Sequence, residues 1–125
     1  MTKNFVELIG FAGKAPKRIG DKGPMKLSIA TTDRWRDSSG EWQERTEWHT
    51  VLFWGRLAGV VGQHVQEGCH VLVTGSLRSR QYADNESHRH TVWEIHARDL
   101  LLLDEPTPSV NNADEPPIKA PTQTA

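Results

Sequence analysis

Apolar side chains would cover both faces of one strand near the middle of the chain, from Glu47 to Trp54. Successive side chains of a β-strand point to opposite faces, so Trp48 and Trp54 would share one face. Val51 and Phe53 would lie on the other. Such a strand is either buried on both sides, or it presents the tryptophan face as a platform for flat ligands such as nucleobases. The segment alone does not decide between the two.

Alternation of apolar and polar positions predicts five strands in all, and a change of period predicts one helix. The strands are expected at Phe5 to Gly13, Met25 to Thr32, Trp42 to Trp54, Cys69 to Tyr82 and Thr91 to Ala97. Between Gly55 and Gly68 the apolar residues fall at helical spacing, which predicts a short amphipathic helix capped by glycine at its end. Three strands, a helix and two strands is the order of the oligonucleotide/oligosaccharide-binding (OB) barrel. The predicted fold class is therefore all-β, a five-stranded OB-fold barrel with one short helix between strands 3 and 4.

The end of the chain differs in composition from the rest. Residues 104–125 contain five of the seven prolines and no aromatic residue, so they cannot bury enough surface to offset the entropy of ordering. We expect an OB-fold domain over residues 1–104 and a disordered, proline-rich tail over residues 105–125. Residues 1–103 carry fourteen Lys and Arg against twelve Asp and Glu, and the remaining 22 carry one against four. The domain is thus mildly basic and the tail acidic.

Length and composition exclude several classes of protein. A chain of 125 residues has room for one core. No apolar run approaches the roughly 18 residues of a membrane span, and the first residues lack the apolar stretch of a secretion signal. One cysteine, Cys69, excludes an internal disulfide and a cysteine metal cluster. The histidines are scattered, and no acid–base pair or phosphate-binding glycine motif is present, so we predict no metal, no cofactor and no enzymatic activity.

Six segments, in order along the chain, carry a resemblance to a known family. They are Phe5-Val6-Glu7-Leu8-Ile9-Gly10, Ser28-Ile29-Ala30-Thr31, Thr46-Glu47-Trp48-His49, Gly55-Arg56-Leu57-Ala58, Gly75-Ser76-Leu77-Arg78-Ser79-Arg80 and Glu94-Ile95-His96-Ala97. Together they resemble the bacterial single-stranded DNA-binding proteins, which have the OB fold. The Thr-Glu-Trp-His and Gly-x-Leu-x-x-Arg segments on either side of the predicted helix are the most specific.

The resemblance implies a role for each matching aromatic and basic residue. Base-stacking aromatics are expected at Trp35, Trp48, Trp54 and Tyr82, and contacts to phosphates at Arg34, Arg36, Arg56, Arg78 and Arg80. The residues themselves place Arg78, Arg80 and Tyr82 on one face of a strand, where cations can pair with phosphates while the ring takes a base. Arginines interleaved with aromatic residues indicate nucleic-acid binding. Because any base can stack, such binding tolerates many sequences.

Three further points concern the remaining tryptophans and the position of Trp35. Strict alternation along the preceding strand turns Trp35 toward the core, so its binding role requires a bend after Thr32. Without the bend, Trp35 is a core residue or a plug of the hairpin. Trp42 would extend the stacking platform, and Trp93 is expected in the core or at an interface.

Assembly is also implied by the resemblance. It implies a homotetramer, or failing that a dimer, with His49, Phe5, Val6 and Leu8 at the contact between subunits. The alternative for His49 is a hydrogen-bonded core histidine.

The function implied is protection of single-stranded DNA in replication, recombination and repair, in the cytoplasm at the nucleoid. Two alternatives stay open: a specialised OB-fold replication adaptor (of primosomal type, a plasmid or phage version, or a tail-poor paralogue), and an RNA-binding OB module. Family members typically end in an acidic run and a terminal aromatic that dock on partner proteins. Residues 116–125 contain neither, so recruitment of partners through the tail is not expected.

Overall fold

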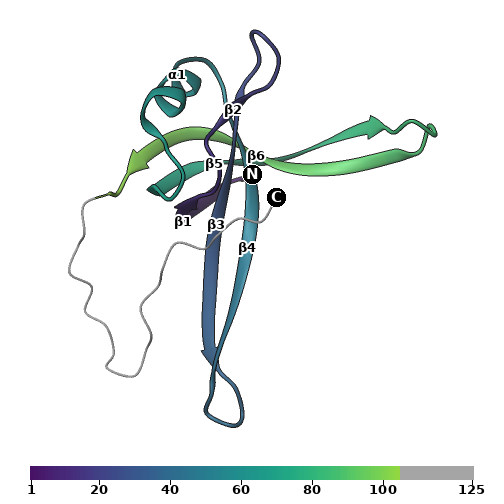
Figure 1. Ribbon diagram of the computed structural model, residues 1–125. Helices are drawn as coiled ribbons and strands as arrows, with labels where there is room; N and C mark the ends of the chain where they lie inside the picture. The colour runs from purple at the N-terminus through teal and green to yellow at the C-terminus, as the bar shows by residue number, and fades with distance from the viewer. Residues whose placement is uncertain (105–125) are drawn as a thin grey trace.

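Long antiparallel strands form most of the structure (Figure 1). The computed structural model describes residues 1–104. The strands are β1 (Val6–Ala12), β2 (Lys17–Arg18), β3 (Met25–Arg36), β4 (Trp42–Phe53), β5 (His70–Ala83) and β6 (Arg89–Leu102), and the helix is α1 (Gly55–His64). The predicted tail, residues 105–125, lies outside the described residues. Within residues 1–104 no helix is long and apolar enough to cross a membrane.

The strands close into a barrel. The sheet order is β1-β5-β6-β4-β3-β2, and β1 also pairs with β3, which closes the ring. Phe11 lies opposite Ala30 in that closing contact. Strands β4 and β6 run parallel where Val51 lies opposite Ile95, whereas the other neighbours in the described sheet are antiparallel. The predicted five-stranded OB barrel with one helix between strands 3 and 4 is confirmed, and the two-residue β2 is an addition at the edge of β3.

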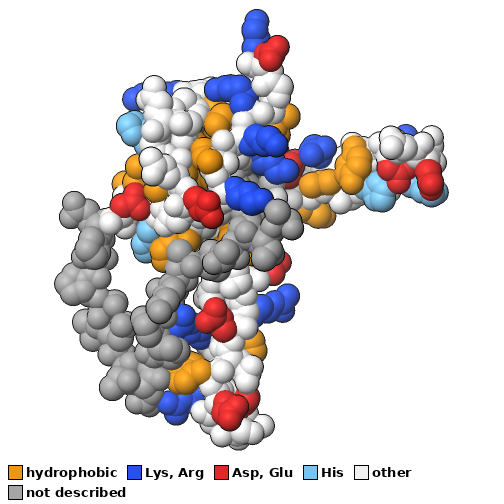
Figure 2. Space-filling view, in the orientation of Figure 1, with side chains coloured by type: hydrophobic (Ala, Val, Ile, Leu, Met, Phe, Trp, Pro, Cys, Tyr) orange, Lys and Arg blue, Asp and Glu red, His pale blue; other side chains and the backbone are white. Residues whose placement is uncertain are grey.

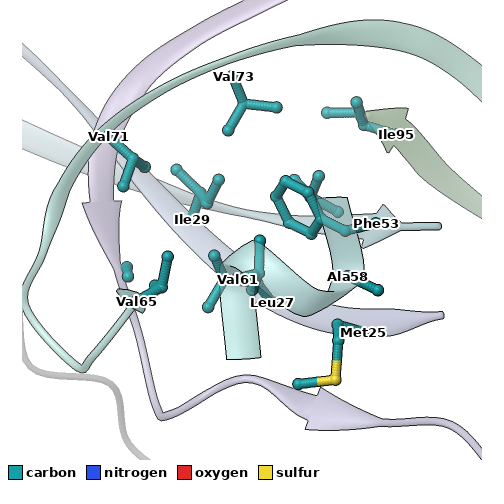
Figure 3. Close-up of a cluster of buried hydrophobic side chains, with 12 residues drawn as sticks. Met25, Leu27, Ile29, Phe53, Ala58, Val61, Val65, Val71, Val73 and Ile95 are labelled. Carbon is teal, nitrogen blue, oxygen red and sulfur yellow. The ribbon is translucent and has the colours of Figure 1, made fainter. Parts of the chain in front are cut away.

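Alternation along the strands fills the barrel with one cluster of apolar side chains (Figure 3). Leu27, Ile29 and Val73 are at most 1% exposed, because every second residue of each strand points inward. Helix α1 adds Val61 to the same cluster. Complete burial of one such side chain contributes about 1.5–3 kcal/mol, so this cluster is the main source of stability of the barrel.

Two glycines allow strands to approach each other closely. A Cβ atom at Gly10 would overlap the backbone carbonyl oxygen of Ala30, so a residue without a side chain is needed where β1 meets β3. Gly75 has the same relation to the backbone of His96. Next to it, between Thr74 and Gly75, the register of β5 and β6 shifts. Such irregularities bend strands, which lets β5 follow the curve of the barrel.

Two hairpins extend beyond the barrel in different directions (Figure 1). Strands β3 and β4 stay paired without interruption from Met25 opposite Phe53 to Arg36 opposite Trp42. Strands β5 and β6 pair out to Ala83 opposite Arg89. Most side chains in the outer halves of both hairpins are exposed, so each hairpin offers two faces to a ligand.

The structure corrects the predicted strand ends. Strand β3 continues to Arg36 instead of ending at Thr32, and β6 spans Arg89–Leu102 instead of residues 91–97. Both extensions are held by cross-strand pairing, to which polar side chains contribute as well as apolar ones. In the β3–β4 hairpin, for example, the hydroxyl oxygens of Thr32 and Thr46 are hydrogen-bonded at 3.0 Å. Apolar alternation alone therefore underestimates the length of these strands.

The predicted glycine cap of the helix is wrong. Helix α1 ends at His64, and its C-cap is Val65, whose N–H donates to the carbonyl oxygen of Val61. Gly68 has a φ of 88° and lies in the turn that follows. There its N–H donates to the carbonyl oxygen of Ala12 at 2.9 Å. The glycine thus serves the turn into β5 and not the helix end.

Candidate nucleic-acid interface

One side of the sheet, opposite the core, carries most of the predicted binding residues. On β4 the core-facing Val51 and Phe53 are fully buried, so Trp48 and Trp54 point to the other side. We call this side of β3, β4, β5 and β6 the outer face. Trp54, directly after β4, is 50% exposed, and Trp48 is partly buried. Of the two interpretations of this strand, burial on both sides is thereby excluded at Trp54.

The outer face of β5 and β6 adds the predicted arginines and the tyrosine. Ile95 of β6 belongs to the core, so the adjacent Glu94 and its cross-strand neighbour Arg78 lie on the outer face. Arg80 and Tyr82 follow at two-residue intervals and are exposed. Figure 2 shows Lys and Arg side chains gathered where the β5–β6 hairpin leaves the barrel. The structure therefore brings the aromatic rings and the cations together on one surface.

Arg80 is held by a carboxylate that the sequence analysis did not identify. Its Nε lies 2.9 Å from Oε1 of Glu94 and its Nη2 lies 3.4 Å from Oε2. Glu94 is 3% exposed, and a buried carboxylate is stable only with such a partner. The Arg80 guanidinium also lies 6.0 Å from the centroid of the Tyr82 ring. Arg80 is thus part of the fold as well as a candidate contact to phosphate.

Trp54 has a histidine partner on the outer face. Its Nε1 donates a hydrogen bond to Nδ1 of His96 at 3.1 Å. Burial lowers the pKa of His96, the charge of Arg78 lowers it further, and Glu94 opposes both effects. The imidazole is thereby kept neutral, the form in which Nδ1 can accept a hydrogen bond. His96 was not predicted as a site residue, although it shares the strand face of Glu94.

Tyr82 also has a histidine neighbour. The rings of Tyr82 and His90 stack at 5.1 Å between centroids, and Nε2 of His90 lies 2.8 Å from Oδ2 of Asp84. This hydrogen bond is the main reason why the pKa of Asp84 lies below its usual value, and a hydrogen bond from the backbone N–H of His88 lowers it further. Within residues 1–104 no three His, Cys, Asp or Glu side chains are placed to hold a metal ion. The histidines of this hairpin contact the tyrosine and the aspartate of its turn.

The bend after Thr32 that a stacking role of Trp35 beside Trp48 would require is absent, because β3 and β4 pair in continuous register out to Arg36. Trp35 consequently lies on the face of the β3–β4 hairpin opposite to Trp48. It is 46% exposed, which excludes the core alternative.

The arginines beside Trp35 have partners within the same hairpin. Nε of Arg34 lies 3.3 Å from Oε2 of Glu44. The Arg36 guanidinium lies over the ring of Trp42 at 5.1 Å. Arg34, Arg36 and Trp42 all belong to the outer face, and Arg56 is exposed at the start of α1 two residues after Trp54.

The predicted contact residues between subunits divide into two groups. Val6 and Leu8 pack against the core of their own barrel, whereas Phe5 is 52% exposed. Nε2 of His49 and Oγ1 of Thr31 are hydrogen-bonded at 2.8 Å in a half-buried position, which agrees with the alternative of a hydrogen-bonded histidine. Trp93 was expected in the core or at an interface. It is 61% exposed, so the core position is wrong and the interface stays a prediction.

Comparison with known proteins identifies the family. The model of the single-strand binding protein family matches residues 3–103. Single-stranded DNA-binding protein 1 of Xylella fastidiosa is 39% identical over 80% of this chain and 76% of its own length. The protein of the same name from Chlorobaculum tepidum is 36% identical over 80% of this chain and 64% of its own length, so this chain spans less than two thirds of that relative.

A solved structure agrees with these matches. A Plasmodium falciparum SSB in complex with single-stranded DNA has a TM-score of 0.72 and 28% identity to this chain, covering 83% of this chain and 97% of its own. The family consists of DNA-binding proteins that are not enzymes, as predicted here. The match of the family model over most of the chain, the identity to its relatives and the shared OB barrel lead to one conclusion: the chain belongs to the single-strand binding protein family.

Proposed function

We propose that this chain binds single-stranded DNA on its outer face with little preference for sequence. The observation that carries the proposal is the position of three aromatic rings and two arginines on one face: Trp48, Trp54, Tyr82, Arg78 and Arg80. Aromatic rings stack on any base, and guanidinium groups pair with phosphates whatever the base. The relative solved in complex with single-stranded DNA supports the same ligand here.

The residues contribute in different ways. Trp54 and Tyr82 have free ring area for stacking, since they are 50% and 45% exposed. Arg78 is exposed beside them and is the first candidate for a phosphate contact, whereas Arg80 shares its charge with Glu94. Arg36 and Arg56 extend the basic path along β3 and to the start of α1. The side chain of Arg34 is only 7% exposed beside Glu44, so its contact with phosphate would require this side chain to move. Trp35 would be reached by DNA that passes around the edge of the β3–β4 hairpin.

The exposed apolar side chains support assembly into a homotetramer or dimer. On the outward side of β1, β5 and β6, Ile9 lies opposite Leu72, which lies opposite Leu101. Ile9 and Leu101 are 53% and 57% exposed, and an apolar row of this kind is typical of an interface between proteins. Phe5, His49 and Trp93 are further candidates for contact between subunits.

In the cell this activity would protect single strands during replication, recombination and repair. That role places the protein in the cytoplasm at the nucleoid and needs no cofactor. Its partners are single-stranded DNA and further copies of itself.

The test is a titration with three nucleic acids of equal length. Oligo-dT should bind most tightly and quench the tryptophan emission, oligo-U should bind more weakly, and duplex DNA should bind least because its bases are not free to stack. Tighter binding of oligo-U would favour an RNA-binding OB module instead. Tighter binding of the duplex would contradict the stacking mechanism.

A further inference from the structure

The contact between Trp54 and His96 joins a candidate base-stacking ring to a group that can change its charge. We propose that His96 is a positioning residue for DNA binding, whose neutral imidazole fixes the indole of Trp54 on the outer face and whose protonation releases it. The consequence for DNA rests on the proposed function, whereas the contact itself does not.

The geometry fixes the indole at its edge and leaves its face free. The two ring planes are nearly parallel, at 21°, and their centroids are 6.0 Å apart, so the rings are displaced sideways from each other. The hydrogen bond from Nε1 to Nδ1 joins their edges. Trp54 remains 50% exposed. A ring that is held in this way loses less side-chain entropy when a base stacks on it than a freely rotating one.

The chemistry of the two nitrogen atoms makes the contact depend on the charge of His96. Indole Nε1–H can only donate, so Nδ1 must be without a proton while the bond exists. Protonation of His96 places a second N–H at Nδ1, and two donors then face each other. Trp54 has no acceptor with which to restore the bond. The indole is therefore fixed only beside a neutral imidazole.

The groups around His96 determine the pH at which its imidazole is protonated and the hydrogen bond from Trp54 is lost. His96 faces Ser76 of β5, and the charged groups that act on it are Arg78 of β5 and Glu94 of β6. On the β4 side it lies opposite Leu52 and contacts Trp54. Burial and Arg78 outweigh Glu94 and lower the pKa of His96. The contact is thus complete at neutral pH and is lost as the pH falls through the lowered pKa.

The neighbouring pair of Tyr82 and His90 provides a contrast within the same surface. His90 contacts an acceptor, Oδ2 of Asp84, through its Nε2. A carboxylate only accepts hydrogen bonds, so this contact does not need a ring nitrogen without a proton. The requirement for a neutral imidazole therefore applies to the contact of Trp54 and not to that of Tyr82.

The first measurement needs no DNA. Because a charged imidazole quenches a neighbouring indole, the tryptophan emission should fall in a single step as the pH is lowered from 8, with a midpoint below the ordinary value for histidine. The step should vanish in His96→Gln and in Trp54→Phe. It should persist in His64→Gln, which changes an exposed histidine at the end of α1. A step that survives in His96→Gln would overturn the contact.

The second measurement is a double-mutant cycle for binding of oligo-dT. It is made at pH 7.5, where His96 is neutral, so that replacing it by another neutral residue leaves the charge of the surface unchanged. His96→Phe keeps a ring but removes the acceptor, and should weaken binding about three- to ten-fold, as expected for one hydrogen bond. His96→Gln supplies an amide oxygen as acceptor and should bind within about two-fold of wild type. In a Trp54→Phe background, His96→Phe should have no further effect. Equal losses with and without Trp54 would overturn the positioning role.

The two measurements separate this inference from the proposed function. A chain that shows the pH step but binds no oligo-dT would refute the proposed function and leave the contact established. A chain that binds oligo-dT without coupling between Trp54 and His96 would refute the inference alone. Thermal unfolding of each variant at pH 7.5 checks that it folds.

Discussion

Trp54 and Trp48 lie on the same face but have different amounts of free surface. Trp54 is half exposed, whereas Trp48 is partly covered and lies opposite Ala30 of β3. A base can bury more area on the first ring than on the second. We therefore expect the contribution to affinity to be larger at Trp54, although both rings lie on the outer face.

Substitution of Trp54 by alanine should weaken binding of oligo-dT by about 1–3 kcal/mol, the contribution of one stacked base. Trp54→Phe keeps a π-face and loses only the hydrogen bond to His96, so it should cost less than Trp54→Ala and serves as the comparison variant. The measurement is fluorescence anisotropy of a labelled oligonucleotide. An unchanged Kd in a folded Trp54→Ala variant would assign this indole to another role.

The two arginines of β5 provide a matched pair for a second prediction. Arg78→Gln should flatten the dependence of log Kd on log salt by roughly 0.7 for one lost phosphate contact, with little effect on stability. Arg80→Gln leaves the buried carboxylate of Glu94 without its partner and should lower the free energy of unfolding by about 1–3 kcal/mol. Salt titrations and denaturant unfolding of both variants test this. Equal loss of stability in the two would contradict the structural role of Arg80.

At the level of the elements, closure of the barrel depends on glycine at the β1–β3 contact. Gly10→Ala would bring a Cβ atom into the carbonyl oxygen of Ala30, so the strands must separate. We expect a clear loss of stability, about 1–3 kcal/mol as for overpacking in a core. Gly59→Ala is the control, because its Cβ would meet nothing within 4 Å and alanine favours a helix by about 1 kcal/mol. The midpoint of urea unfolding should fall for Gly10→Ala and rise for Gly59→Ala.

The order of the elements could be predicted because each carries its own periodicity. Strands with inward residues such as Leu27, Ile29 and Val73, and a helix with Val61, show their pattern locally. The outer half of β3 could not be predicted. The segment from Thr32 to Arg36 lacks an alternation of apolar and polar residues, and it is a strand because it pairs with β4. Strand parity predicted that Trp48 and Trp54 share one face of β4 and that Arg78, Arg80 and Tyr82 share one face of β5. Their expected roles in DNA binding came from the resemblance to the family. The contact of Trp54 with His96 depends on the parallel register of β4 and β6, which no local pattern contains.

For the whole molecule, the apolar row of Ile9, Leu72 and Leu101 is the surface on which assembly should depend. Ile9→Glu places a charge in that row and should shift the protein to a smaller species, because burying an unpaired carboxylate is costly. Ile19→Glu changes an apolar side chain that is 44% exposed elsewhere and should leave the assembly unchanged. Sedimentation velocity measures the size of the assembly formed by each variant. Identical sedimentation of Ile9→Glu and wild type would exclude this row as the interface.

The pairing of β1 with β5 has a consequence for synthesis on the ribosome. The β3–β4 hairpin is complete once Phe53 has emerged, but β1 has no partner on its β5 side until Val71 to Gly75 follow. Contacts between distant segments form late. We expect pulse-labelled amides of β4 to gain protection from exchange before those of β1 during refolding, and simultaneous protection would contradict this order. Until β5 is made, the nascent chain carries an open strand edge that a second nascent chain on the same messenger can occupy.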